Sequence, residues 1–242
     1  GQMYKNQIER YRSLAASESG TAIYRFVLGM CHFLLPLKEP RQVARNRALG
    51  AFEEALTIDN STLWAYWGLK RAHLFMGEDL SAVALEKATQ VCKDALKISP
   101  AAPSSAQAFR ELAECYELQA HYSPDATDEA LGRAKEEYLH ALMLDQLDLA
   151  AHLRLGILQR RDYEFDTAVE HLRIVAQNDP LQLLSSVELA RIHKDLGQLD
   201  EAIRQYESYL DLSDHYRHFP TSLIVTSLDQ GALSGADVEL DL

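Results

Sequence analysis

The chain has 242 residues, of which 47% are hydrophobic and 25% charged, so it can fold around a substantial core rather than stay disordered. Its formal net charge of −12 disfavours proteins that grip nucleic acid or anionic membranes through a basic surface. The longest apolar run, residues 26–37, is shorter than the roughly 20 residues that a membrane-spanning helix needs, so we expect no membrane span.

Residues 1–20 are predicted to form a leading amphipathic helix and a linker. Tyr4, Ile8, Tyr11 and Leu14 recur with a helical period, and residues 17–20 interrupt it.

Ten further segments have helical periodicity, and breaks that contain Pro, Gly, Asn or Asp separate them into five pairs. The predicted helices are 23–35 and 43–58, 63–75 and 80–98, 106–120 and 129–144, 149–159 and 165–177, and 183–196 and 200–212. No useful stretch alternates with a period of two, so we expect no sheet.

The last two pairs share a pattern at a spacing of 34 residues. Gly156, Ala168, Leu172 and Val175 are followed at that spacing by Ala190, Ala202, Tyr206 and Tyr209. A 34-residue period with small residues at fixed places is typical of stacked helix–turn–helix repeats.

Over residues 21–214 the chain resembles the tetratricopeptide-repeat family, whose pattern is W-x2-L-G-x2-Y followed by Ala, an aromatic residue or Leu, Ala and Pro. The better matches are Trp64, Trp67, Gly68, Ala88, Cys92, Ala95 and Pro100; Leu155, Gly156, Ala168, Leu172 and Pro180; and Leu189, Ala190, Ala202 and Tyr206. Weaker matches are Leu28, Gly29, Ala48, Phe52 and Ala55, and Leu112, Ala113, Ala134, Tyr138 and Ala141.

The resemblance implies an all-α, right-handed α-solenoid of about five helix–turn–helix repeats, with a concave face that binds other proteins. In each repeat, a small residue in the first helix lets the second helix pack closely, and the later aromatic residue fills the space toward the next repeat.

The second and third repeats are longer than the fourth. Gly68 and Ala88 are 20 residues apart and Ala113 and Ala134 are 21 apart, whereas Gly156 and Ala168 are 12 apart. The extra residues must lengthen the helices or the loops within these repeats. Either a second contact surface or a tolerated surface insertion explains them.

By the same resemblance, first helices line the concave face. The predicted groove has an apolar end and a basic end, with Arg110 on the same face: Phe26, Met30, Tyr66, Leu69, Arg110, Arg154, Arg160, Arg161, Arg191 and Lys194. This distribution favours a partner protein whose segment combines apolar anchors with acidic residues. A second interpretation stays open, in which the leading helix covers the apolar residues and solvent surrounds the arginines.

The chaperone carboxylate clamp of this family does not match the chain. Its Lys and Asn places fall on Phe26 and Met30, on Ala65 and Leu69, or on Arg110 and Glu114, which lack the required side chains in combination. We therefore expect no binding to a chaperone C-terminus.

Catalytic and metal-binding patterns are weak. Asp214, His215 and His218 are close in sequence, but Arg217 between them opposes a bound cation, so we expect no metal site and no cofactor. None of the common nucleotide-binding or hydrolytic motifs occurs, so we expect no enzymatic activity.

Cys31, Cys92 and Cys115 lie in apolar-periodic stretches, which predicts buried thiols in a reducing, intracellular compartment, the cytoplasm.

Residues 215–242 form an acidic and apolar tail outside the repeats. It is open whether this tail is a capping helix, a loose end, or a segment docked in a groove.

The sequence predicts a non-catalytic scaffold or adaptor subunit that binds a partner segment on its concave face. Two alternatives are kept: a regulatory or substrate-presenting module of an enzyme, and an RNA-binding helical repeat. Only the basic residues and Trp64 with Trp67 support the latter, so binding to nucleic acid is not expected.

Overall fold

The structure, a computed structural model, describes residues 6, 9–11, 13–14, 21–34, 40–75, 82–98, 105–123, 127–179 and 182–216, without the side chains of 75 and 211–216. Every regular element in these ranges is a helix, which confirms the all-α fold class. The predicted leading helix lies mostly outside the described residues, and so does the tail beyond residue 216.

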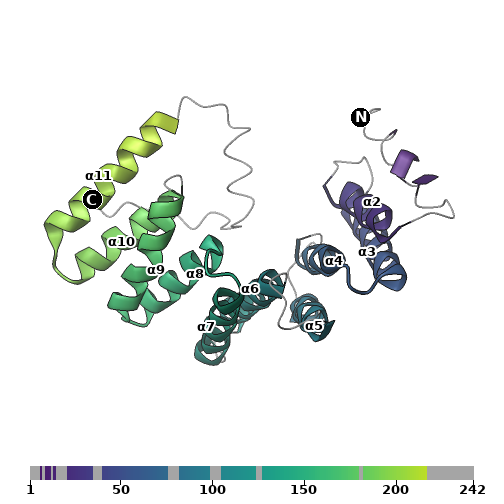
Figure 1. Cartoon of the computed structure of the whole chain (residues 1–242), viewed down its shortest axis with the longest axis horizontal. Coiled ribbons are helices and arrows are strands. Elements are labelled where there is room, and N and C mark those ends of the chain that lie inside the picture. The colour runs from purple at the N-terminus through teal and green to yellow at the C-terminus, as the bar shows by residue number, and fades with distance from the viewer. Residues whose placement is uncertain are drawn as a thin grey trace. The chain divides into compact units, whose positions relative to one another are not determined.

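Ten helices follow residue 21 in the described part of the chain, in the order that Figure 1 labels. They are α2 (Ala22–Leu34), α3 (Arg41–Ile58), α4 (Leu63–Phe75), α5 (Ala82–Ile98), α6 (Ala106–Tyr122), α7 (Thr127–Leu144), α8 (Leu149–Arg161), α9 (Phe165–Asn178), α10 (Leu183–Asp195) and α11 (Leu199–Tyr216). The five predicted pairs are confirmed, with ends that differ by at most a few residues.

The chain forms two compact bodies, Gly1–His171 and Leu172–Leu242, which we call the N-terminal body and the C-terminal body. The division falls within α9. In the N-terminal body, α2 packs on α3, α4 on α5 and α6 on α7, and each second helix also contacts the first helix of the next pair. In the C-terminal body, α10 packs on α11.

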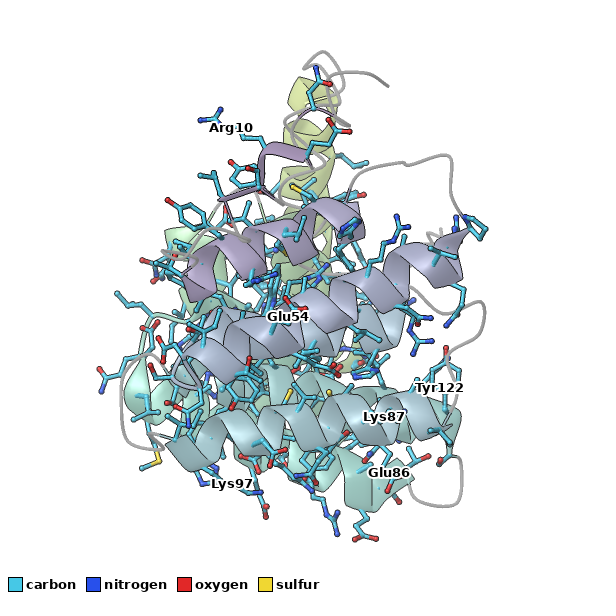
Figure 2. The ribbon with its side chains drawn as sticks, turned by 90° about the vertical axis from the view of Figure 1, so that its right-hand side faces the viewer. Arg10, Glu54, Glu86, Lys87, Lys97 and Tyr122 are labelled. Atoms are coloured by element: carbon cyan, nitrogen blue, oxygen red, sulfur yellow. The ribbon has the colours of Figure 1, made fainter. Side chains whose placement is uncertain are left out.

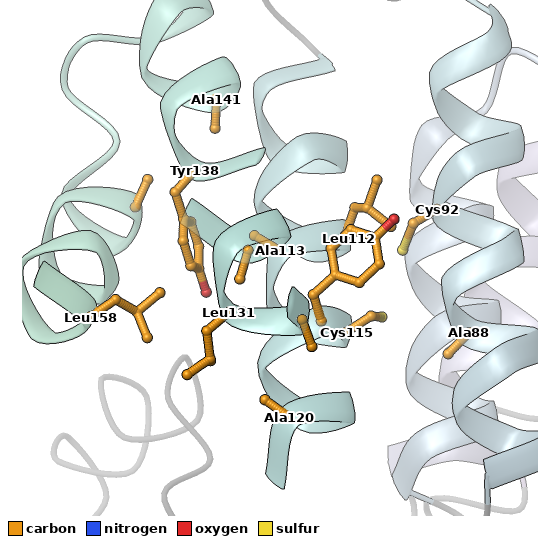
Figure 3. Packing of buried hydrophobic residues seen from close by; sticks show 14 of the residues in the cluster. Ala88, Cys92, Leu112, Ala113, Cys115, Ala120, Leu131, Tyr138, Ala141 and Leu158 are labelled. Atoms are coloured by element: carbon orange, nitrogen blue, oxygen red, sulfur yellow. The ribbon is translucent and has the colours of Figure 1, made fainter. Parts of the chain in front are cut away.

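Positions predicted to hold the repeats together are buried. Ala48, Phe52 and Ala55 in α3 are fully buried, and so are Ala134, Tyr138 and Ala141 in α7. Figure 3 shows Tyr138 between Ala113 of α6 and Leu158 of α8, within one core cluster. The second helix of a repeat therefore uses its small residues and its aromatic residue as the resemblance implies.

The extra residues of the third repeat lengthen its helices. Helices α6 and α7 have 17 and 18 residues, whereas α8 and α9 have 13 and 14. Because α6 continues through Tyr122, the link to α7 is shorter than the predicted loop. In the second repeat α5 has 17 residues, and its remaining extra length falls outside the described residues.

The 34-residue period is also present in the backbone. At the end of α8, Tyr163 N–H donates to the carbonyl of Arg160 at 3.0 Å; at the end of α10, Gly197 N–H donates to that of Lys194 at 2.9 Å. Tyr163 and Gly197 both have positive φ, 62° and 73°. The two turns are thus built alike, although only one has the residue that this conformation favours.

Cys92 and Cys115 are buried free thiols, as predicted, whereas Cys31 is only half-buried. Among the described helices, none has both the length and the apolar character that crossing a bilayer requires.

Candidate functional site

Most of the apolar residues predicted to line the groove are part of the protein's own hydrophobic core. Leu69 is only 6% exposed and packs with Ala48 and Phe52 of α3. Phe26 and Met30 are partly buried in the same cluster, and the Phe26 ring lies 5.8 Å from that of Phe52. Helix α4 packs against α3 of the preceding repeat, and Leu69 is part of that contact.

A row of polar side chains runs along one face of α6. Gln107, Arg110, Glu111, Glu114 and Glu117 recur at spacings of three and four residues, which places them on the same side of the helix. Partners on α4 and at α8 meet this row. We call the ion-paired residues the charged strip: Lys70, Arg110, Glu111, Glu114, Glu117, Asp148 and Arg154.

Lys70 is the most buried member of the charged strip. Its side chain is 2% exposed, and its ammonium group contacts Glu111 and lies 2.7 Å from Glu114 Oε2. Burial alone would lower the pKa of Lys70, but the carboxylates of Glu114 and Glu111 outweigh it and raise this pKa well above the ordinary value. A charged Lys70 thus ties α4 of the second repeat to α6 of the third.

Arg110 extends the charged strip to the fourth repeat. Its Nε lies 2.8 Å from Asp148 Oδ2, and the other oxygen of Asp148 accepts a 3.0 Å hydrogen bond from Ala151 N–H. Asp148 is therefore both the N-cap of α8 and the partner of Arg110. One short side chain fixes the start of α8 against α6.

Arg154 and Glu117 form the last pair of the charged strip. Arg154 Nη1 lies 3.5 Å from Glu117 Oε2, and the buried Tyr138 hydroxyl donates a 2.7 Å hydrogen bond to Glu117 Oε1. Burial raises the pKa of Glu117, and Arg154 and the Tyr138 hydrogen bond oppose this only in part.

The sequence predicts a basic end of the groove, but ion pairs neutralise part of its positive charge. The charged strip holds three cations and four carboxylates, a formal sum of −1. Arg110 and Arg154 are thus already paired within the N-terminal body and do not form a free basic surface. Arg161 is half-exposed and lies 3.6 Å from Asp128, and Arg160 also has an interaction partner.

The two remaining basic residues of the predicted groove lie in the C-terminal body. Arg191 pairs with Glu188 at 2.7 Å. Lys194 is exposed and has no ion pair among the described residues. Because they belong to a different body from Arg110 and Arg154, one groove containing all of these residues remains a prediction.

A small hollow adjoins the charged strip at the start of α6. Residues of α4, α5 and α6 line it: Leu63, Tyr66, Trp67, Cys92, Ala95, Gln107, Ala108 and Glu111. Arg71 covers one face of Trp67, with its guanidinium carbon 5.0 Å from the ring centroid. Burial and the nearby Asp94 raise the pKa of Tyr66, so its hydroxyl stays protonated. We call this the aromatic hollow.

The outer face of α5 carries exposed charged side chains, in contrast to the largely buried charged strip. Glu86, Lys87 and Lys97, which Figure 2 labels, are all exposed. No group of three or more metal-ligating side chains occurs among the described residues. The Asp214, His215 and His218 cluster lies outside the described side chains.

Of the residues predicted from the sequence, Arg110 and Arg154 belong to the charged strip and Tyr66 lines the aromatic hollow, while their role in binding stays a prediction; Lys70, Glu111 and Asp148 were not among the predicted residues. A usable signal was present in α6, where charged residues recur along the face that should meet neighbouring first helices. The pairing itself was not visible, because Lys70 and Glu114 are 44 residues apart in sequence.

No protein-family model and no curated protein matches the sequence. Solved structures do resemble the fold. MamA is 15% identical with a TM-score of 0.57, over 74% of this chain and 94% of MamA. TTC0263, a thermophilic TPR protein in Thermus thermophilus, is 19% identical with a TM-score of 0.58, over 86% and 98%. YrrB, described as a TPR protein with an unusual peptide-binding site, is 15% identical with a TM-score of 0.56, over 91% and 100%.

Proposed function

We propose that this chain, which has the tetratricopeptide-repeat fold, is a non-catalytic adaptor or scaffold subunit that binds a partner segment along α4 and α6 of its N-terminal body. The observation that carries the proposal is the aromatic hollow beside the charged strip. A hollow with aromatic walls next to partly exposed charges suits an apolar anchor with a polar neighbour.

The similarity to YrrB supports the class of activity, because that protein is described as having a peptide-binding site. The charged strip supports it physically. Ion pairs between successive repeats hold α4, α6 and α8 in one arrangement, and a preorganised surface loses less entropy when it binds.

The alternative of RNA binding gains no support from the ion pairs. Phosphate binding needs available cations, and Arg110 and Arg154 already have carboxylate partners. No observation favours the regulatory module of an enzyme over a scaffold. The cytoplasmic location stays a prediction based on the cysteines.

Selection from a random peptide library against the full chain tests the proposal. Peptides that bind should lose affinity for a Tyr66→Ala variant, which removes a wall of the aromatic hollow. They should keep their affinity for Met143→Ala, because Met143 is 77% exposed on α7. Thermal melting of both variants checks that each still folds. Failure to enrich any peptide, or peptides sensitive only to Met143, would contradict the proposal.

A further inference from the structure

We infer that the partner segment places a lysine or arginine on the charged strip, beside Glu114 and Glu117, while an apolar side chain enters the aromatic hollow. This inference rests on the proposed function and specifies the chemistry of the partner. It differs from the acidic partner that the sequence alone favoured.

The balance of charge within the strip is the first argument. Three cations and four carboxylates give the strip a formal charge of −1, although each carboxylate contacts at least one cation. A cation would neutralise the strip. An acidic side chain would instead compete with Glu114, Glu117 and Asp148 for arginines that these residues already hold, and would add a second uncompensated charge.

The accessibility of the carboxylates is the second argument. Glu114 is the most exposed member of the strip, at 27%, and its Oε1 has only a 3.8 Å contact with Arg110. Glu117 is 18% exposed, and its Oε2 has only the 3.5 Å contact with Arg154. A carboxylate offers about four lone-pair positions, so both groups can accept further hydrogen bonds. Lys70, by contrast, is buried beneath them.

The spacing along α6 gives the third argument. Gln107 in the aromatic hollow and Glu114 lie on the same face of α6, seven residues apart, which is about 10 Å at the helical rise of about 1.5 Å per residue. An extended peptide advances about 3.3 Å per residue. A segment running along α6 therefore needs its basic residue about three positions from its apolar anchor to reach Glu114, and about four or five to reach Glu117.

Matched peptides on the full chain test the inference. Each peptide carries one valine or leucine anchor, in keeping with the small volume of the hollow, and, at the third and fourth positions on one side, lysine, glutamine or glutamate. Fluorescence anisotropy measures their affinities at low and high salt. The lysine peptides should bind about tenfold or more tightly than the glutamate peptides, and high salt should reduce the difference.

Two variants test whether the preference for lysine peptides comes from the charged strip. Glu114→Gln and Glu117→Gln should each weaken the lysine peptides and leave the glutamine peptides nearly unchanged. Glu86→Gln, on the outer face of α5, should change neither. Glu117→Gln retains a hydrogen-bond acceptor for Tyr138, so the inference can still be judged if Glu114→Gln lowers stability.

Tighter binding of the glutamate peptides overturns the basic partner and leaves the proposed function standing. A lysine preference that neither Glu114→Gln nor Glu117→Gln reduces overturns the placement on the strip. Binding no better than that of anchor-free peptides, for all three charges, overturns both the inference and the proposed function.

Discussion

The ring of Phe52 occupies the space where a side chain on Gly68 would begin. A Cβ atom at Gly68 would lie 2.6 Å from two ring atoms of Phe52, and one at Gly29 would lie 2.5 Å from the same ring. Phe52 is fully buried, so its ring has little room to move away. The first and second repeats are therefore joined by one aromatic ring between two glycines.

We predict that Gly68→Ala destabilises the protein by about 1–3 kcal/mol, the range typical of overpacking a core. Gly50→Ala is the matched control, because nothing lies within 4 Å of a Cβ there and the position is inside α3. It should stabilise by about 0.5–1 kcal/mol, since alanine restricts the unfolded chain more than glycine does. Equal effects of the two substitutions on urea unfolding would show that Phe52 does not fill this space.

Lys70→Met should be severely destabilising. It leaves Glu111 and Glu114 without their buried cation, and breaking a buried ion pair costs about 3–5 kcal/mol. Adding Glu111→Gln should recover part of that loss, because one of the two stranded carboxylates is gone. Lys97→Met, at a side chain that is 70% exposed, should change stability by less than about 1 kcal/mol. A Lys70→Met variant as stable as Lys97→Met would mean that the strip does not hold the repeats together.

His152 and His171 predict a loss of stability in mild acid. The Nδ1 atoms of the two rings are 2.7 Å apart, and His152 Nε2 lies 3.0 Å from the carbonyl of Gln146. A carbonyl only accepts, so Nε2 carries the proton of neutral His152, and its Nδ1 accepts from His171 Nδ1–H. Burial, with a smaller effect of His152, lowers the pKa of His171; the nearby Glu170 opposes the shift.

Because folding lowers the pKa of His171, the unfolded chain binds protons more readily. The stabilisation is complete above the unfolded pKa of about 6.5 and is lost as pH falls from there through the lower folded pKa. Urea midpoints measured across this window should fall with pH, and His171→Asn should reduce the slope. His121→Gln, at an exposed position, should not. An unchanged slope in His171→Asn would contradict this role, and His73, whose pKa burial also lowers, would then be the residue to test.

The turns after α8 and α10 give a prediction about backbone strain. Gly197→Ala forces a Cβ into a left-handed conformation and should cost about 1–2 kcal/mol. Tyr163→Gly should have the opposite sign but a smaller size, because the strained residue also contacts Phe165, with ring centroids 5.9 Å apart. Gly132→Ala, where a Cβ would meet open space, is the control. Thermal melts in which Gly197→Ala matches Gly132→Ala would show that the turn tolerates side chains freely.

The helix pairs could be predicted because the information is local. Apolar periodicity marks each helix, and Pro, Gly, Asn and Asp mark the breaks, so even α4 and α8 begin where expected. The 34-residue period is also visible in the backbone, because Tyr163 and Gly197, 34 residues apart, both have positive φ. These features depend on residues that are close in sequence.

The site could be predicted only in part, because its properties depend on neighbours in other repeats. Periodicity shows that Leu69 lies on an apolar face but not that this face meets α3. In the sequence, Lys70 looks like an ordinary surface lysine, because its partners Glu111 and Glu114 are 41 and 44 residues away. Likewise, Arg110 looks like a free cation unless Asp148, 38 residues later, is known to cap α8 beside it.

Mapping where a bound peptide touches the protein tests the central claim most directly. Titration of the isotopically labelled full chain with the lysine peptide, followed by backbone amide NMR, reports each contacted helix. The account predicts that the largest shifts fall at Tyr66 and Trp67 of α4 and between Gln107 and Glu117 of α6. Shifts confined to the outer faces of α5 and α7, around Glu86 and Met143, would contradict it.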